Sequence, residues 1–175
     1  MKKMFFLFLV LLLLGFNYSC SKKIDSEETI KKCKDECSNI NDPDFCKRIC
    51  EKEILNPRWK FFTFDKEGSA WFYDLESIST SYDIVPVWLK TICSERVRQN
   101  KIKEIGKKAE KLDHFLWFCE IDCSKRRYRV LELIAYASND SILEEKKNYS
   151  ENTTIWEPIL PDTRIEWLFK EICKK

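Results

Sequence analysis

The spacing of the cysteines constrains this chain more than any other feature of its sequence. Four of its nine cysteines form the pattern Cys33-x3-Cys37 followed by Cys46-x3-Cys50. Because residues four apart lie on one face of a helix, each pair points in a single direction. In an antiparallel pair of helices, Cys37 lies beside Cys46 near the turn and Cys33 lies beside Cys50 further away. The spacing therefore predicts a helical hairpin held by two nested disulfides.

The residues between the two pairs support this hairpin. Asp42 is suited to cap a second helix, and Pro43 to occupy its first turn. A unit this small cannot bury enough apolar surface by itself, so crosslinks of about 2–4 kcal/mol each explain how it persists. The same four thiols also suit a tetrathiolate zinc site, although zinc ligands more often stand two residues apart. A thiol oxidoreductase is disfavoured because the chain has no Cys-x-x-Cys pair.

The N-terminus has the layout of a bacterial lipoprotein signal. Two lysines precede an apolar run that ends near Phe16, and Cys20 follows directly before a charged stretch. The run is shorter than the roughly 20 residues that a membrane-spanning helix needs. We predict a signal peptide over residues 1–19 and lipidation, such as palmitate, at Cys20. Asn17 replaces the aliphatic residue usual three positions before such a cysteine, so ordinary secretion or an uncleaved anchor stays an alternative.

Lipidation of Cys20 leaves eight cysteines, an even set that suits an oxidising compartment. Beyond the hairpin, Cys123 ends a predicted strand and is the natural partner of Cys173 on a predicted C-terminal helix. Cys93 and Cys119 remain, on the two strands that flank a charged excursion of the chain. These two are predicted to face each other across the excursion, which completes four disulfides.

From Arg58 onward, short runs rich in aromatic and β-branched residues predict strands. Consecutive short strands without long helices between them imply an antiparallel sheet. In the last of them, alternation places Tyr128, Val130, Ile134 and Tyr136 on one face. The predicted strands are Trp59–Phe64, Ala70–Asp74, Ile84–Cys93, Phe115–Asp122 and Tyr128–Ala137.

Two further segments carry helical patterns. The charged stretch from Ser94 to Asp113 has apolar residues at helical spacing, so it is a helical excursion or a long hairpin loop. Asp162 is suited to cap a C-terminal helix whose apolar stripe packs onto the sheet. The predicted fold class is α+β, with an antiparallel sheet packed by a C-terminal helix and preceded by the stapled helical hairpin.

Five sequence blocks follow one another between Arg58 and Cys173. They are Trp59–Asp65, Gly68-x-Ala70-Trp71-Phe72-Tyr73-Asp74-x-x-Ser77-Ile78, Val85-x-Val87-Trp88-x-Lys90, Glu120-Ile121-Asp122-Cys123-x-x-Arg126-Arg127-x-Arg129-Val130-Leu131, and Trp156-Glu157-Pro158-Ile159-x-Pro161. In this order they resemble the surface-adhesin protein E family. The resemblance implies a sheet backed by a C-terminal helix, a Cys123–Cys173 bridge, and a lipoprotein on a bacterial surface that binds host matrix or serum proteins. The expected domains are a tether and hairpin at 20–57 and a protein E-like domain at 58–175; the hairpin and the pair Cys93 and Cys119 depart from the family pattern.

The densest basic cluster of the chain follows Cys123. It consists of Lys125, Arg126, Arg127 and Arg129. As candidate ligand-binding residues, these cations suit acidic glycans, lipid head groups or carboxylates on a protein partner. The alternative is that Arg127 and Arg129 are solvated or pair with Glu120 and Asp122 on the neighbouring strand.

Composition excludes several function classes. The 31 basic and 29 acidic residues nearly balance, which argues against a nucleic-acid binder. The one histidine, His114, has no accompanying serine or cysteine motif, so it is interpreted as a surface residue rather than a general base. The six tryptophans are assigned mostly to the core rather than to a sugar-binding platform. We predict no enzymatic activity, no cofactor and no metal site.

The sequence thus predicts a non-enzymatic binding or adhesion module, anchored through an N-terminal lipid to the bacterial cell envelope, at the outer membrane or cell surface. Its expected partners are the membrane and a protein or glycan ligand. A homodimer is a further candidate assembly, because an open sheet has edges that can pair. The alternative is a structural or accessory envelope lipoprotein that binds another component of the same envelope.

Overall fold

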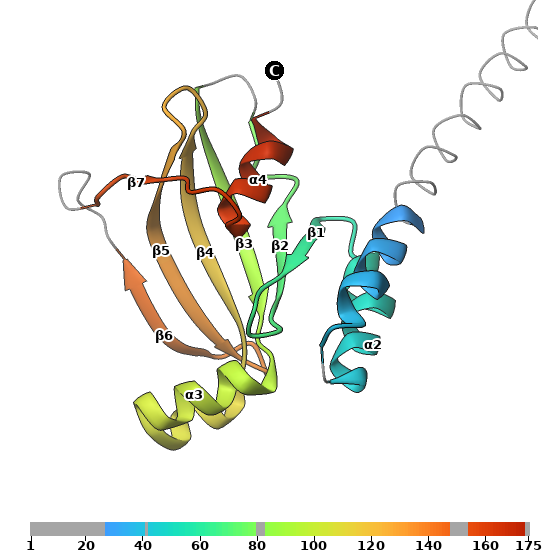
Figure 1. Ribbon diagram of the computed structural model, residues 1–175. Coiled ribbons are helices and arrows are strands. Elements are labelled where there is room, and N and C mark those ends of the chain that lie inside the picture. The colour runs from blue at the N-terminus through green and yellow to red at the C-terminus, as the bar shows by residue number, and fades with distance from the viewer. Residues whose placement is uncertain (1–26, 41, 80–82, 148–153, 174–175) are drawn as a thin grey trace, which may run out of the picture.

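An antiparallel sheet forms the body of the protein, with helices beside one edge, at one end and on one face (Figure 1). The computed structural model describes residues 27–40, 42–79, 83–147 and 154–173. The strands are β1 (Trp59–Phe64), β2 (Ala70–Asp74), β3 (Ile84–Ile92), β4 (Leu112–Asp122), β5 (Arg127–Ala137), β6 (Ile142–Lys147) and β7 (Glu157–Pro158). The helices are a first helix at residues 27–37, α2 (Pro43–Glu51), η1 (Glu53–Leu55), α3 (Glu95–Ile105), η2 (Gly106–Lys111) and α4 (Arg164–Ile172). The predicted signal peptide and lipidated Cys20 lie outside the described residues.

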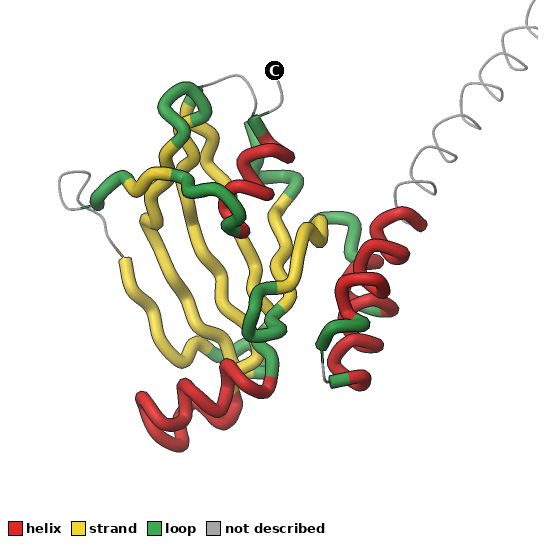
Figure 2. Tube along the Cα trace, in the orientation of Figure 1, coloured by secondary structure: helices red, strands yellow, loops and turns green. Residues whose placement is uncertain are grey.

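The strands follow chain order across the sheet, from β1 at one edge to β6 at the other, and β7 pairs with β5 beyond the end of β6. All pairings are antiparallel, and in Figure 2 the strands form one curved layer. This is the predicted α+β architecture, with the helical hairpin before the sheet and α4 after it. Within the described ranges, no helix combines the length and hydrophobicity that crossing a membrane requires.

The charged excursion between β3 and β4 is helical. Its N-cap is Ser94, whose side-chain oxygen accepts a hydrogen bond from the backbone N–H of Val97 at 3.3 Å. α3 ends at Gly106, which adopts a positive φ of 75°, and η2 continues to the start of β4. The helical interpretation is therefore confirmed, and the long hairpin loop is wrong.

One prediction about β5 is wrong because the strand contains a bulge. Phe118 of β4 pairs with Glu132, but the next residue, Cys119, pairs with Val130. The extra residue on β5 reverses the side-chain alternation. Tyr128 and Val130 therefore pack on the face covered by α4, whereas Tyr136 lies on the opposite face.

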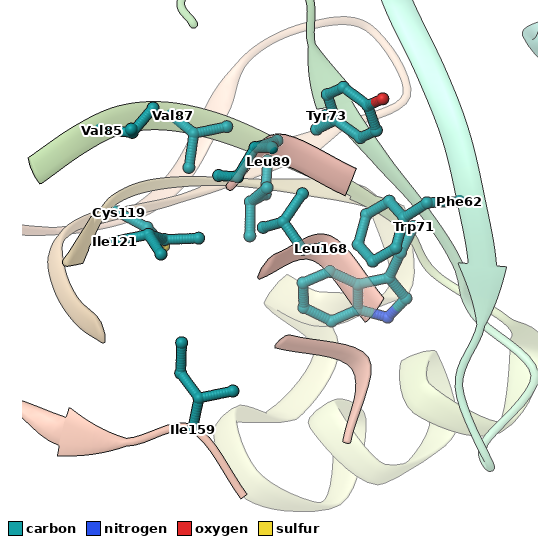
Figure 3. Close-up of a cluster of buried hydrophobic side chains, with 11 residues drawn as sticks. Phe62, Trp71, Tyr73, Val85, Val87, Leu89, Cys119, Ile121, Ile159 and Leu168 are labelled. Carbon is teal, nitrogen blue, oxygen red and sulfur yellow. The ribbon is translucent and has the colours of Figure 1, made fainter. Parts of the chain in front are cut away.

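The main core lies between one face of the sheet and α4. Figure 3 shows Leu168 of α4 among the side chains of β2, β3 and β4, with Ile159 closing one side. Leu168 is fully buried, and Ile172 lies one helical turn further along the same stripe. The helix begins one residue later than predicted, because Thr163 rather than Asp162 is its N-cap.

The N-terminal hairpin has both predicted disulfides. Cys33 bonds to Cys50 and Cys37 to Cys46, each with Cα atoms 5.7 Å apart. Asp42 caps α2 as predicted, since its carboxylate accepts a hydrogen bond from a backbone N–H of the first turn at 2.9 Å. The hairpin packs the apolar side of its helices against Phe61 and Phe72, on the sheet face opposite α4. It is thus part of the same folded body as the sheet.

A third disulfide joins Cys123, at the end of β4, to Cys173, at the end of α4, with Cα atoms 5.6 Å apart. The predicted Cys93–Cys119 bridge is wrong, because both cysteines are free and buried. Cys119 lies opposite Val87, six residues before Cys93 along the chain of β3. Six residues of extended strand span roughly 20 Å, whereas bridged cysteines have Cα atoms within about 7 Å. Burial raises the pKa of both thiols to about 12, so neither forms a reactive thiolate near neutral pH.

Candidate ligand-binding site

The basic cluster that follows Cys123 is engaged in ion pairs within the protein. Arg127 contacts Asp122 at 2.9 Å, and Arg129 contacts Glu120 at 2.7 Å, each directly across the β4–β5 pair. Both guanidinium groups also lie over the ring of Trp156, at 4.5 and 4.6 Å from its centroid. The structure thus shows the intramolecular pairs that the sequence offered as the alternative to a ligand-binding role.

The turn between β4 and β5, at residues 123–126, connects the sheet to α4. Arg126 adopts a positive φ of 49° and pairs with Glu166 of α4. Its backbone carbonyl accepts a hydrogen bond from the N–H of Ile159 at 3.1 Å. Lys125 lies in this turn with an exposed side chain. Three of the four candidate cations therefore have structural partners, which favours a search for the ligand elsewhere.

Asp122 organises this turn. Burial raises the pKa of its carboxyl group, but hydrogen bonds from Ser124 and from the Lys125 backbone N–H, together with Arg127, hold the pKa below its ordinary value. The carboxylate therefore stays ionised at neutral pH and fixes the turn between β4 and β5. This role is structural.

A groove with two hollows lies between the C-terminal segment at residues 157–167, the β1–β2 turn at residues 65–69 and the hairpin. The first hollow, of about 460 Å³, includes Tyr128, Leu160 and Arg164 in its wall. The second, of about 750 Å³, extends to Ile40 of the hairpin and Arg96 of α3. The hollows share five wall residues, which are Thr63, Phe64, Asp65, Lys66 and Trp167. We call the two hollows together the Trp167 groove.

Trp167 is the exposed aromatic side chain of this groove. It directly precedes Leu168 of the inward stripe of α4 but lies off that stripe, and 52% of the residue is exposed. The ammonium groups of Lys32 and Lys170 lie 5.7 and 5.8 Å from the ring centroid. Of the other tryptophans, Trp71 is buried and the remaining four are half-buried. The prediction that most tryptophans belong to the core therefore misses the one that faces solvent.

The β1–β2 turn between the two hollows is held in one conformation. One oxygen of Asp65 accepts backbone hydrogen bonds from Glu67 and Ser69, and the other accepts the indole N–H of Trp71, all at 2.9 Å. Gly68 has a positive φ of 84° and faces Ile40, so a larger residue here would be strained. The groove is therefore pre-formed, as most ligand sites are.

His114 is not the solvated residue that the sequence predicts. It lies within β4, stacks on Tyr136 with ring centroids 5.0 Å apart, and has Nδ1 3.0 Å from a carboxylate oxygen of Asp113. Asp113 also contacts Arg48 of α2 at 3.2 Å, and its pKa is lowered, first by the hydrogen bond with His114. The contacts among Arg48, Asp113 and His114 connect the hairpin to β4. His114 does not line the Trp167 groove. Among the described residues, no group of three or more histidine, cysteine or acidic side chains is arranged to hold a metal ion.

A family model described as surface-adhesin protein E matches residues 59–174. The chain belongs to this family. The matched region contains the sheet and α4. The hairpin lies before the matched region and is not part of it. Membership assigns the protein to a family of bacterial surface adhesins, as the sequence resemblance implies.

Solved structures of Haemophilus influenzae protein E are similar to this chain. Crystal form II of that protein is 12% identical, with a TM-score of 0.41 over 59% of this chain and 79% of the other. A second structure, of protein E from a non-typeable strain, is also 12% identical, with a TM-score of 0.40 over 65% of this chain and 74% of the other. No curated protein matches the chain.

Proposed function

We propose that this member of the surface-adhesin protein E family is a lipid-anchored, non-enzymatic binding module whose protein or glycan ligand docks in the Trp167 groove. In this layout residues 1–19 are the signal peptide, Cys20 carries the lipid, 20–57 form the tether and hairpin, and 58–175 form the binding domain. Each buried methylene of an acyl chain contributes about 0.8 kcal/mol to membrane attachment. The lipid holds the domain at the membrane, and the ligand binds in the groove.

The observation that carries this proposal is the exposure of Trp167 between two hollows. Tryptophan offers a large contact area with few rotatable bonds, and it is enriched among the residues that dominate binding energy. Leu160, also exposed, extends the apolar wall of the first hollow. Charged side chains such as Lys66 and Arg164 surround this apolar centre and supply polar contacts. An apolar anchor with a polar rim is the usual composition of a recognition surface.

Replacing Trp167 with alanine is expected to weaken ligand binding at least tenfold while leaving the fold intact. The mature chain is immobilised and exposed to matrix glycoproteins, to the same proteins after deglycosylation, and to detergent-solubilised envelope of the producing cell. Leu55→Ala is the matched control, because Leu55 is 60% exposed but lies outside the groove. It should bind like the wild type.

Each outcome of this experiment has a distinct meaning. A loss of binding after deglycosylation identifies a glycan, and unchanged binding identifies a protein surface. Retention of envelope components alone favours the second candidate, an accessory lipoprotein with a partner in its own envelope. Equal binding by the folded Trp167→Ala protein and the wild type would contradict the groove as the ligand site.

A further inference from the structure

β1 is the strand at one end of the sheet order, so its outer edge has no neighbouring strand within the sheet. Such an edge presents backbone N–H and C=O groups that another chain can pair with. Its sequence, Trp-Lys-Phe-Phe-Thr-Phe, is aromatic and has one charge, which is the composition of a segment that pairs readily with copies of itself. Such an edge stays unpaired only where another part of the chain covers it.

The first helix of the hairpin supplies this cover. Lys32 donates a hydrogen bond from Nζ to the backbone carbonyl of Phe62 at 2.8 Å. Glu36, one turn later, accepts a hydrogen bond from the backbone N–H of Phe64 at 3.2 Å. Residues four apart rise about 6 Å along a helix, and residues two apart in a strand are separated by roughly 6.6 Å. The two side chains therefore match the repeat of the strand edge, and Figures 1 and 2 show the hairpin beside β1.

The hairpin is held against this edge from both faces of the sheet. On one face its buried disulfide Cys33–Cys50 packs with Phe61 and Phe72. On the other, the Lys32 ammonium lies over the ring of Trp167 of α4. The burial of Glu36 raises its pKa, although the N–H of Phe64 and Lys32 act in the opposite direction. The hairpin thus crosses the edge and contacts the layers on both sides.

The opposite edge of the sheet is protected differently. β6 ends in the charged sequence Glu-Glu-Lys-Lys, with Lys146 paired to Glu144 at 3.1 Å and Lys147 to Glu145 at 2.6 Å. Charged side chains on an edge strand disfavour pairing with another copy. β1 carries only one charged residue, Lys60, against the four charged residues that end β6, so we assign the protection of the β1 edge to the hairpin.

We propose that the stapled hairpin is an edge guard, which keeps a second copy of this chain from pairing with β1. The occupant that it excludes is the β1 of another copy, because two identical aromatic strands can pair antiparallel about a two-fold axis and join two sheets into one. Opening of the hairpin converts the monomer into a dimer joined through β1. The hairpin also contributes Glu36 and Ile40 to the wall of the Trp167 groove, but exclusion of a second β1 strand requires no ligand there.

The test compares two double variants of the first helix in the mature full-length chain in detergent micelles. Lys32→Ala with Glu36→Ala removes both contacts to the β1 edge. Lys34→Ala with Asp35→Ala changes the same charges on exposed positions of the same helix and serves as control. Hydrogen exchange of the Phe64 amide is measured at a dilution where the protein is monomeric, and sedimentation velocity is measured over a range of concentrations.

In the first variant the Phe64 amide should exchange at least tenfold faster, and a dimer should appear as concentration rises. The control should match the wild type in both measurements. Glu36→Gln keeps an oxygen acceptor and should preserve protection, whereas Glu36→Ala should not; this pair carries the test if the double variant does not fold. Unchanged exchange at Phe64, or faster exchange without a dimer at any concentration, would overturn the edge-guard proposal.

Discussion

Replacement of both Cys123 and Cys173 by alanine is expected to lower the free energy of unfolding by about 4 kcal/mol. The bridge closes a loop of 50 residues in sequence separation, and the chain-entropy model assigns about that value to a loop of this length. The bridge also joins the end of β4 to the end of α4, the helix that covers the main core. Urea unfolding of the variant and the wild type measures the difference.

The matched control removes the short bridge between Cys37 and Cys46. Its separation is only 9 residues, and Cys33–Cys50 still closes the hairpin around it, so its loss should cost clearly less. Equal losses for the two variants, or a loss below about 1 kcal/mol for the longer bridge, would contradict the entropic account.

Leu168→Ala is expected to destabilise the protein by about 3 kcal/mol, within the usual range for a buried leucine. Leu168 is fully buried in a cluster with side chains of β1, β2, β3 and β4, and its truncation leaves a cavity between α4 and the sheet. Denaturant titration followed by tryptophan fluorescence gives the change in unfolding free energy.

The neighbouring residue provides the control for this core substitution. Trp167→Ala, one position earlier on α4, should cost less than about 1 kcal/mol because half of the residue is already in water. The two substitutions therefore separate stability from binding on adjacent positions of one helix. A larger loss from Trp167→Ala than from Leu168→Ala would mean that the helix faces are assigned incorrectly.

Local patterns predict the hairpin and most of the sheet. The four-residue spacing of cysteines and the Asp42-Pro43 pair both specify helices, and the nested bridges follow from antiparallel geometry. The pairing of Arg127 with Asp122 follows because both residues flank the tight turn between β4 and β5. These features depend on residues that are close in sequence, so a single sequence contains enough information to specify them.

Register between distant strands is harder to predict. The prediction of a Cys93–Cys119 bridge fails because 19 residues, most of them helical, separate β3 from β4, and nothing local reveals that Cys119 lies opposite Val87. The bulge at Leu131 has the same effect within β5, because one extra residue reverses which side chains face the core. β6 escapes prediction because its run of charges hides the alternation of a strand.

The Trp167 groove is assembled from parts that no local pattern joins. Its walls come from the hairpin, the β1–β2 turn, α3 and the C-terminal segment. One signal was present in the sequence, because Trp167 stands off the apolar stripe formed by Ile165, Leu168 and Ile172. An aromatic residue on the outer side of a core-facing helix is a candidate binding residue, which the proposed function assigns to Trp167.

Mass spectrometry of the mature protein, with thiols alkylated before and after denaturation, tests most directly the claim that this is an exported, lipid-anchored chain held by three disulfides. The predicted product begins at an acylated Cys20, takes up no label in the native state, and takes up two labels after denaturation, at Cys93 and Cys119. A product that retains Met1, or one whose hairpin cysteines are alkylated without reduction, would contradict the account.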